Sequence, residues 1–272
     1  MAEPTTAADI NLIASFLAHE QVLDLSQAPP TDCLVLCGSA ILHCAETVFS
    51  ALRERPNLAQ TLVICGGIGH STQYLYNAIA QCPRYSILSP EIQGLPESRV
   101  LNMILQRFYK APNITRAGCK FIIEDRSTNC GANALETRKL LEAHNVPTPK
   151  SFIIVQDPTM SLRTLAAFRK TYDDTPIPPT FAACPTFVPK VEMIDGKLEY
   201  ATKGVDSAGL WEIGRFCDLV LGEVARLRDD ADGYGPRGTG FIDHVDIPEQ
   251  VAEAWRRSRS VTAGVRMRLA NQ

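Results

Sequence analysis

Four short apolar runs, each followed by a polar or glycine-rich turn and then by a helical pattern, constrain the fold of this chain most strongly. The runs cover residues 32–37, 61–65, 119–123 and 151–155. Short apolar runs of this kind are typical of strands buried on both faces of a sheet. The segments between them are long enough for crossovers, so the strands are expected to be parallel. The sequence therefore predicts an α/β fold with a mostly parallel sheet and helices on both faces.

The turns after these runs carry most of the residues able to bind a ligand. The carboxyl ends of parallel strands meet at one edge of the sheet, and ligands of such sheets bind there. One shared cleft is therefore predicted at this edge. Two further candidates lie on helices, Glu97 in a first turn and Arg163 one turn into the helix after the fourth run. The candidates in the turns and helix starts are Gly38, Ser39, Gly66, Gly67, Gly69, His70, Ser71, Thr72, Glu124, Asp125, Ser127, Thr128, Asn129, Asn133, Gln156 and Asp157.

The turn after the second run has three glycines in four positions, at Gly66, Gly67 and Gly69. Backbone N–H groups and the helix dipole at such a junction favour an anionic or hydroxyl-rich ligand. A tight turn that needs positive φ explains some of these glycines, but less well all three. Thr72 stands where a dinucleotide-binding motif has its third glycine, and no lysine follows to make a P-loop.

Several candidates have both a functional and a structural interpretation. His70 is a general acid or base, or a residue that hydrogen-bonds at a helix start. Asp125 and Asp157 are expected either to approach one another and bind hydroxyls, an amino group or a metal, or to cap helices. Arg163 is expected to pair with one of these acids or with a ligand carboxylate. A nucleophile motif of the Gly-x-Ser-x-Gly type is absent from the sequence.

Composition limits the class of protein. The net charge of -3, without a basic block, argues against a nucleic-acid partner. The sequence has neither a signal-peptide pattern nor an apolar run near the ~20 residues that span a bilayer, so a soluble cytoplasmic protein without a membrane partner is expected. Nine cysteines occur without a Cys-x-x-Cys pair, so we expect buried free thiols and no metal site. Cys130 is less clear, because it lies near a predicted helix start that would stabilise a thiolate.

Two regions are expected, an α/β domain over residues 1–180 and a smaller extension over residues 181–272. An amphipathic helix over residues 6–23, with Thr6 as its cap, begins the first region. The second contains a hairpin over residues 191–200 with an Asp-Gly turn, and a helix over residues 207–228. The acidic, glycine-rich segment that follows does not fit a calcium-binding EF-hand, because Arg228 and Thr239 occupy the first and last ligand positions.

Four sequence strings resemble those of the YdcF-like proteins, an uncharacterised family that also includes the SanA and ElyC proteins. The resemblance spans residues 8–256, and it implies a Rossmann-like three-layer α/β/α fold with a smaller C-terminal part. For the YdcF branch it also implies binding of S-adenosylmethionine. Two positions depart from the family pattern, Ala132 in place of a glutamate and Met160 in place of a histidine. The strings are GGIGHST at 66–72, IEDRSTNCGANA at 123–134, VQDPTM at 155–160 with Arg163 and Thr164, and RLRDD at 226–230 with GPRG at 235–238.

The leading hypothesis is a small-molecule binding protein for S-adenosylmethionine or a related adenosyl compound, with transferase activity as an open question. Asp125 or Asp157 would accept from the ligand ammonium, and N–H groups of residues 67–72 would donate to its carboxylate. Glu97 or Asn129 would bind the ribose hydroxyls. One alternative is a hydrolase or transferase that acts on a phosphorylated or carrier-linked metabolite through His70 and Asp125. A non-catalytic regulatory module is the other, and the sequence leaves the oligomeric state open.

Overall fold

The computed structural model describes residues 5–109, 114 and 118–270. A five-stranded, all-parallel sheet forms its centre, with the strand order β3-β2-β1-β4-β5. This confirms the predicted α/β fold with a parallel sheet, and the arrangement is Rossmann-like. The fifth strand is not among the four apolar runs from which the sequence predicted strands. The strands are β1 Thr31–Cys37, β2 Ala59–Cys65, β3 Lys120–Glu124, β4 Ser151–Val155 and β5 Thr180–Cys184.

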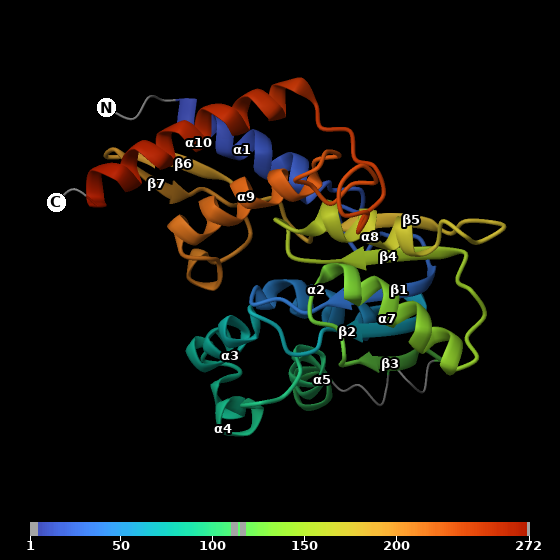
Figure 1. Cartoon of the computed structure of the whole chain (residues 1–272). Coiled ribbons are helices and arrows are strands. Elements are labelled where there is room, and N and C mark those ends of the chain that lie inside the picture. The colour runs from blue at the N-terminus through green and yellow to red at the C-terminus, as the bar shows by residue number, and fades with distance from the viewer. Residues whose placement is uncertain (1–4, 110–113, 115–117, 271–272) are drawn as a thin grey trace.

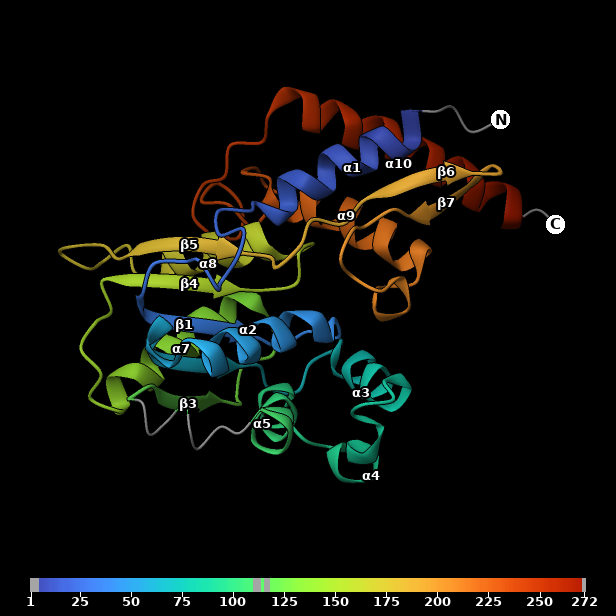
Figure 2. The same ribbon diagram turned by 180° about the vertical axis from the view of Figure 1, so that it is seen from behind.

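Helices cover both faces of this sheet (Figure 1). The helices α2 (Leu42–Glu54) and α5 (Glu97–Phe108) lie on one face, and α7 (Cys130–Ala143) and α8 (Ser161–Thr171) lie on the other (Figure 2). The helix α3 (Thr72–Gln81) lies beyond the carboxyl ends of the strands in both views. The shorter helical turns are η1 Pro56–Leu58, η2 Ser86–Leu88 and α4 Ser89–Ile92.

The register of the sheet aligns the turns that follow the strands. Cys37 pairs with Cys65, and Cys65 pairs with Glu124, so β1, β2 and β3 end level with one another. On the other side of β1, Leu36 pairs with Val155. The next residues along each strand therefore start their turns at the same edge, as the sequence predicted for this set of junctions.

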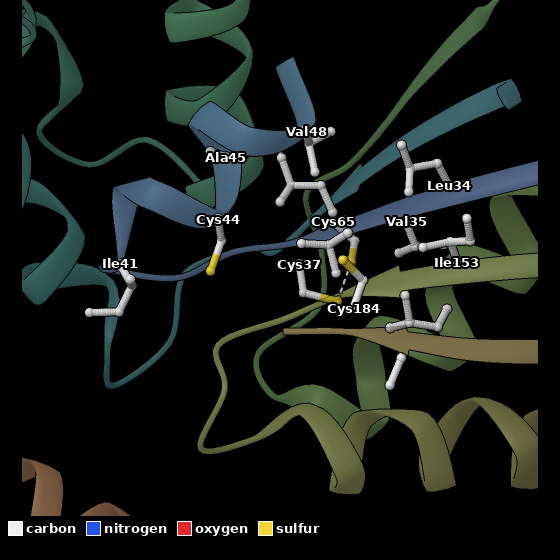
Figure 3. Close-up of a cluster of buried hydrophobic side chains, with 14 of the residues drawn as sticks. Leu34, Val35, Cys37, Ile41, Cys44, Ala45, Val48, Cys65, Ile153 and Cys184 are labelled. Carbon is white, nitrogen blue, oxygen red and sulfur yellow. Dashed lines mark hydrogen bonds between the residues drawn. The ribbon is translucent and has the colours of Figure 1, made fainter. Parts of the chain in front are cut away.

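The centre of the sheet is filled by aliphatic side chains and thiols, part of which Figure 3 shows around β1 and α2. Cys33, Cys37, Cys65 and Cys119 are buried, and all nine cysteines are free, as predicted. The sulfur atoms of Cys37 and Cys65 lie 3.5 Å apart, directly before the glycine turns. These thiols act as small apolar groups in the core.

The C-terminal part contains a hairpin, β6 (Val191–Ile194) and β7 (Lys197–Tyr200), and the helices α9 (Ile213–Leu227) and α10 (Glu249–Ala270). Asp195 and Gly196 both have positive φ, at 50° and 78°, as the predicted type I′ turn requires. The helix α9 starts later than predicted. The side chain of Glu212 caps it by accepting from the N–H groups of Gly214 and Arg215, and residues 207–209 form a separate turn, η3 (Ser207–Gly209).

The N-terminal helix α1 (Thr5–Ala18) packs against α10, α9 and β6 rather than on the central sheet (Figure 1). An ion pair joins Asp9 to Arg257 of α10. The prediction of a helix over residues 6–23 was too long, since His19 takes a φ of 44° and ends the helix. Thr6 lies inside this helix instead of capping it. The expected boundary after residue 180 falls within β5.

None of the helices in the described part of the chain is both long and apolar enough to cross a bilayer.

Candidate ligand site at the carboxyl edge of the sheet

The turns after β1 and β4 meet where the strand order of the sheet reverses. The chain runs from β1 outward to β2 and β3, and then returns to place β4 on the other side of β1. Ligands of open parallel sheets bind outside the strand ends at such a switch point. Here the Ser39 hydroxyl, after β1, donates to Oδ2 of Asp157, after β4, at 3.3 Å. This hydrogen bond locates the centre of the candidate site.

Asp157 is a buried acid whose hydrogen-bond donors in the described part of the chain are all neutral. Its side chain is 3% exposed, and its Oδ1 atom accepts from the backbone N–H of Thr159 at 2.9 Å and from the Thr159 hydroxyl at 2.7 Å. Burial raises the pKa of Asp157 to about 6, although these hydrogen bonds act in the opposite direction. The negative charge of nearby Glu223 raises the pKa further. Asp157 therefore exchanges its proton close to neutral pH.

Glu97 is a second buried acid at the same edge. It is the first residue of α5, and its Oε1 atom accepts from the hydroxyls of Thr72 at 2.9 Å and Ser71 at 3.5 Å. Burial raises the pKa of Glu97 above its ordinary value, partly offset by these two hydroxyls. A Cβ atom at Gly38 would overlap Oε2 of Glu97, so only glycine fits there. The carboxyl group of Glu97 therefore lies against the end of β1.

Neither acid has a cationic partner within the described residues. In that part of the chain no lysine, arginine or histidine nitrogen forms an ion pair with Glu97 or Asp157. A buried carboxylate is unfavourable unless it is paired, hydrogen-bonded or protonated. Two such acids, one at either side of the β1 turn, therefore make this edge suited to a cation or to hydroxyl groups.

The glycines of the β2 turn are required by the close approach of the β3 turn. A Cβ atom at Gly67 would overlap the carbonyl oxygen of Ser127, and one at Gly69 would lie 2.9 Å from that of Thr128. The N–H of Gly67 donates to Ser127 O at 2.8 Å, and the N–H of Gly69 donates to the Thr72 hydroxyl at 2.8 Å. These two N–H groups, which we expected to bind a ligand carboxylate, are already engaged within the protein. Gly66, with a φ of 142°, is the one that needs conformational freedom.

The β3 turn is held by its own side chains. The carboxylate of Glu124 accepts from the N–H groups of Arg126 and Ser127 at 2.6 and 2.8 Å, and from the Ser127 hydroxyl. Asn129 caps α7 by accepting from the N–H of Ala132 at 3.0 Å. Asn133 is 6% exposed within the same helix. Glu124 and Asn129 thus organise the turn that packs on Gly67 and the start of α7, whereas Asn133 lies buried one turn further along the helix.

Asp125 and Asp157 do not approach one another as the sequence suggested. Two strands, β2 and β1, lie between β3 and β4. At ~4.8 Å per strand, the two turns are separated by roughly 14 Å. Asp125 instead pairs with Arg99, and the Nη2 atom of Arg99 lies 2.7 Å from Oδ2 of Asp125. The sequence left the approach of Asp125 to Asp157 open because it does not give the strand order.

Arg163 does not face Asp125 or Asp157 either. Its guanidinium forms a two-point ion pair with Glu223 of α9, and the side chains are 11% and 2% exposed. Arg226 also contacts Glu223, at 3.0 Å. Glu223 was not among the candidates from the sequence, although a signal was present, since an acid between Val220 and Val224 interrupts the apolar face of α9.

The remaining candidates are split between the surface and the interior. His70 and Ser71 are exposed in the β2 turn. Gln156 is buried, accepts from the N–H of Asp157 at 2.6 Å and points its amide nitrogen toward the Cys130 sulfur at 3.8 Å. Cys130 is the first residue of α7, so the predicted helix start there is confirmed. His70 is thus on the outside, while Gln156 supports Asp157 from within.

Two cavities lie away from this edge. One of about 400 Å³ runs along α2 between Asp24 and Arg84, and one of about 490 Å³ lies at the opposite edge of the sheet, beside Ala59 and Lys120. Neither is lined by a candidate residue. Neither cavity corresponds to the cleft predicted at the carboxyl edge.

A search against models of known protein families finds no match to this chain. In the described part of the chain, no group of three or more histidine, cysteine, aspartate or glutamate side chains is arranged to hold a metal ion.

Proposed function

We propose that the carboxyl edge of the sheet binds a small organic molecule that carries a positive charge and hydroxyl groups. The observation that carries this proposal is the pair of buried acids, Glu97 and Asp157, beside the β1 turn without an ion pair in the described chain. Among the residues that the structure describes, those near Glu97 and Asp157 donate to them only through hydroxyls and backbone N–H groups. A cationic ligand would provide the missing partner for their charge.

S-adenosylmethionine or a related adenosyl compound is the leading candidate for this ligand. Its sulfonium and ammonium groups are cationic, and its ribose offers two hydroxyls to a carboxylate. The sequence resemblance to YdcF-like proteins supports the same ligand, and we propose membership of that family on the strings quoted above. Transferase activity is part of this proposal only as a consequence of binding a methyl donor, and the fold by itself does not specify an acceptor.

The charge of the site disfavours the alternative of a hydrolase that acts on a phosphorylated metabolite. A phosphate placed between Glu97 and Asp157 would meet two acids and no cation from the described residues. The nearby arginines Arg163 and Arg99 are already paired with Glu223 and Asp125. His70, the base in that alternative, is exposed, and its partner Asp125 is neutralised. A regulatory module would use the same ligand site without turnover.

Thermal unfolding with a ligand panel tests the proposal. Adenosylmethionine is expected to raise the midpoint more than adenosylhomocysteine, which lacks the sulfonium charge, and ATP or sugar phosphates are expected to leave it unchanged. A ligand at 100 times its dissociation constant stabilises the native state by ~2.7 kcal/mol, so the shift is measurable. A larger shift with sugar phosphates than with adenosylmethionine would replace this proposal by the phosphorylated-metabolite alternative.

A further inference from the structure

Tyr74 and Arg215 meet across the mouth of the carboxyl edge from distant parts of the chain. Tyr74 lies in α3, which follows the β2 turn, and Arg215 lies in the first turn of α9. The start of α9 and α3 face one another beyond the strand ends in both views (Figure 1, Figure 2). The guanidinium carbon of Arg215 lies 3.6 Å from the centre of the Tyr74 ring. This stacked pair joins the C-terminal part to the rim of the site.

The two sides of this pair are anchored separately. Thr72, two residues before Tyr74, donates to the buried carboxyl of Glu97. On the other side, Glu212 fixes the first turn of α9 by accepting from the N–H groups of Gly214 and Arg215. Tyr74 is 44% exposed, and Arg215 is partly buried. The backbones on the two sides are therefore held, while Tyr74 remains accessible to solvent.

We propose that Tyr74 and Arg215 form a clamp that holds the planar heteroaromatic ring of the ligand. A guanidinium and a phenol ring are both flat, and both stack on nucleobases. Insertion of a ring would widen their separation to about 7 Å, two contact distances, which the flexible arginine stem allows. The inner acids would then bind the cationic or hydroxyl-bearing part of the same molecule. This inference rests on the proposed function, and it specifies the ligand as a nucleoside-like compound.

A purely structural role is the competing explanation, in which the pair only fastens α9 to α3. Cation–π contacts at exposed sites stabilise by ~0.5–1 kcal/mol, so their loss would lower stability slightly. It would not change affinity for one part of a ligand selectively. The variants Tyr74→Ala and Tyr74→Phe separate the two roles, because Phe keeps the ring and Ala removes it.

The test is calorimetric titration of the full chain with adenosylmethionine and with S-methylmethionine, which has the sulfonium and ammonium groups but no ring. Tyr74→Ala is expected to weaken adenosylmethionine binding about 10-fold, as loss of one base–aromatic stack does. Tyr74→Phe is expected to remain within about 2-fold of wild type, and neither variant should change S-methylmethionine binding. Urea unfolding of each variant checks that the fold is intact.

The Asp157→Asn variant distinguishes failure of this inference from failure of the proposed function. Binding that is lost in Asp157→Asn but unchanged in Tyr74→Ala overturns the clamp and leaves the acid site standing. Binding of adenosine that needs Tyr74 but is indifferent to Asp157→Asn supports the clamp and overturns the acid site. If the wild-type protein binds none of these compounds at millimolar concentration, both are overturned.

Discussion

Two regions of this chain bring glycine-rich turns together with acidic side chains, namely residues 228–240 and the carboxyl edge of the sheet, yet their acids have different partners. In the segment after α9, over residues 228–240, Asp229 accepts from the N–H of Arg237 at 2.6 Å and pairs with the Arg237 and His244 side chains. At the carboxyl edge, Glu97 and Asp157 are held by neutral donors alone among the described residues. Composition thus does not distinguish a self-contained turn from a ligand site, whereas the partners of the buried acids do.

Glycine content does not distinguish the two regions either. A Cβ atom at Gly233 would overlap the carbonyl oxygen of Arg228, and one at Gly67 would overlap that of Ser127. In both turns the glycines serve close backbone packing. The three glycines of the β2 turn indicate a ligand site in the sequence. The nearby acids, which have no cationic partner in the described part of the chain, are the stronger indication.

The largest loss of stability is expected on substitution of Glu223, a buried acid of the C-terminal part that has a cationic partner. Glu223→Ala would leave the guanidinium of Arg163 buried without its carboxylate. Breaking a buried pair in this way destabilises by ~3–5 kcal/mol. Urea unfolding measures this loss, with Glu249→Ala as the control, since the pair of Glu249 with Arg256 is exposed. Equal stability of the two variants would mean that Glu223 is not a paired, buried acid.

Substitution of Asp157 is expected to raise the free energy of unfolding at neutral to alkaline pH, whereas substitution of Glu223 lowers it. Its pKa is about 6 in the folded state, above the ordinary value of 3.8, so the native state holds its proton over a pH range in which the unfolded state has lost it. Stability from this group is therefore fully present below pH ~4 and is lost as pH rises through about 6, by roughly 3 kcal/mol in total. Asp157→Asn should be more stable than wild type at pH 8.

The difference between Asp157→Asn and wild type should vanish near pH 3.5, where both side chains are neutral. Free energies of unfolding measured from pH 3.5 to 8 give this difference directly. A variant that is less stable than wild type at pH 8 would show that the carboxylate of Asp157 is well paired. The proposed difference between Asp157, without a cationic partner in the described chain, and the paired Asp229 would then be wrong.

A moderate loss is expected when a glycine that touches backbone gains a methyl group. Gly233→Ala should destabilise by ~1–3 kcal/mol, because overpacking shifts the Arg228 backbone. Gly209→Ala is the matched control, as nothing lies within 4 Å of the position its Cβ would take. Thermal unfolding of both variants decides whether residues 228–240 form the tightly packed turn described above. Similar midpoints for both would contradict it.

The smallest effect is expected at the exposed pair of Arg99 and Asp125. Both side chains are partly solvated, at 52% and 30% exposure. Arg99→Ala should therefore change the free energy of unfolding by less than ~1 kcal/mol. It should also leave ligand affinity unchanged, since Asp125 lies on the far side of β2 and β1 from Asp157. An affinity loss as large as that of Asp157→Asn would bring Asp125 back into the site.

Much of the fold followed from local patterns in the sequence. The runs of β1 to β4 and the hairpin turn at Asp195 and Gly196 were predicted because short-range periodicity and turn chemistry determine them. The strand β5 was missed, since Thr180–Cys184 is short and follows prolines. The association of α1 with α10 was also not predictable, because it depends on contacts between residues about 250 positions apart, such as Asp9 and Arg257.

The shared edge of the candidate residues was predictable from the sequence, whereas the partners of their side chains were not. Asp157 and Glu97 were both candidates from the sequence, and both lie at the edge where β1 ends. The pairing of Arg163 with Glu223, and of Asp125 with Arg99, required the strand order and the position of α9. Sequence patterns identify which turns share an edge, whereas only the three-dimensional arrangement shows which charges are already neutralised.

We propose that a ligand supplies the cationic partner that Glu97 and Asp157 lack among the described residues. Calorimetric titration of adenosylmethionine at pH 7.5 into wild type, the double variant Glu97→Gln with Asp157→Asn, and Asp125→Asn tests it most directly. We predict that wild type and Asp125→Asn bind alike, while the folded double variant loses at least about 10-fold in affinity, a difference of ~1.4 kcal/mol. Equal binding by all three proteins would contradict the account.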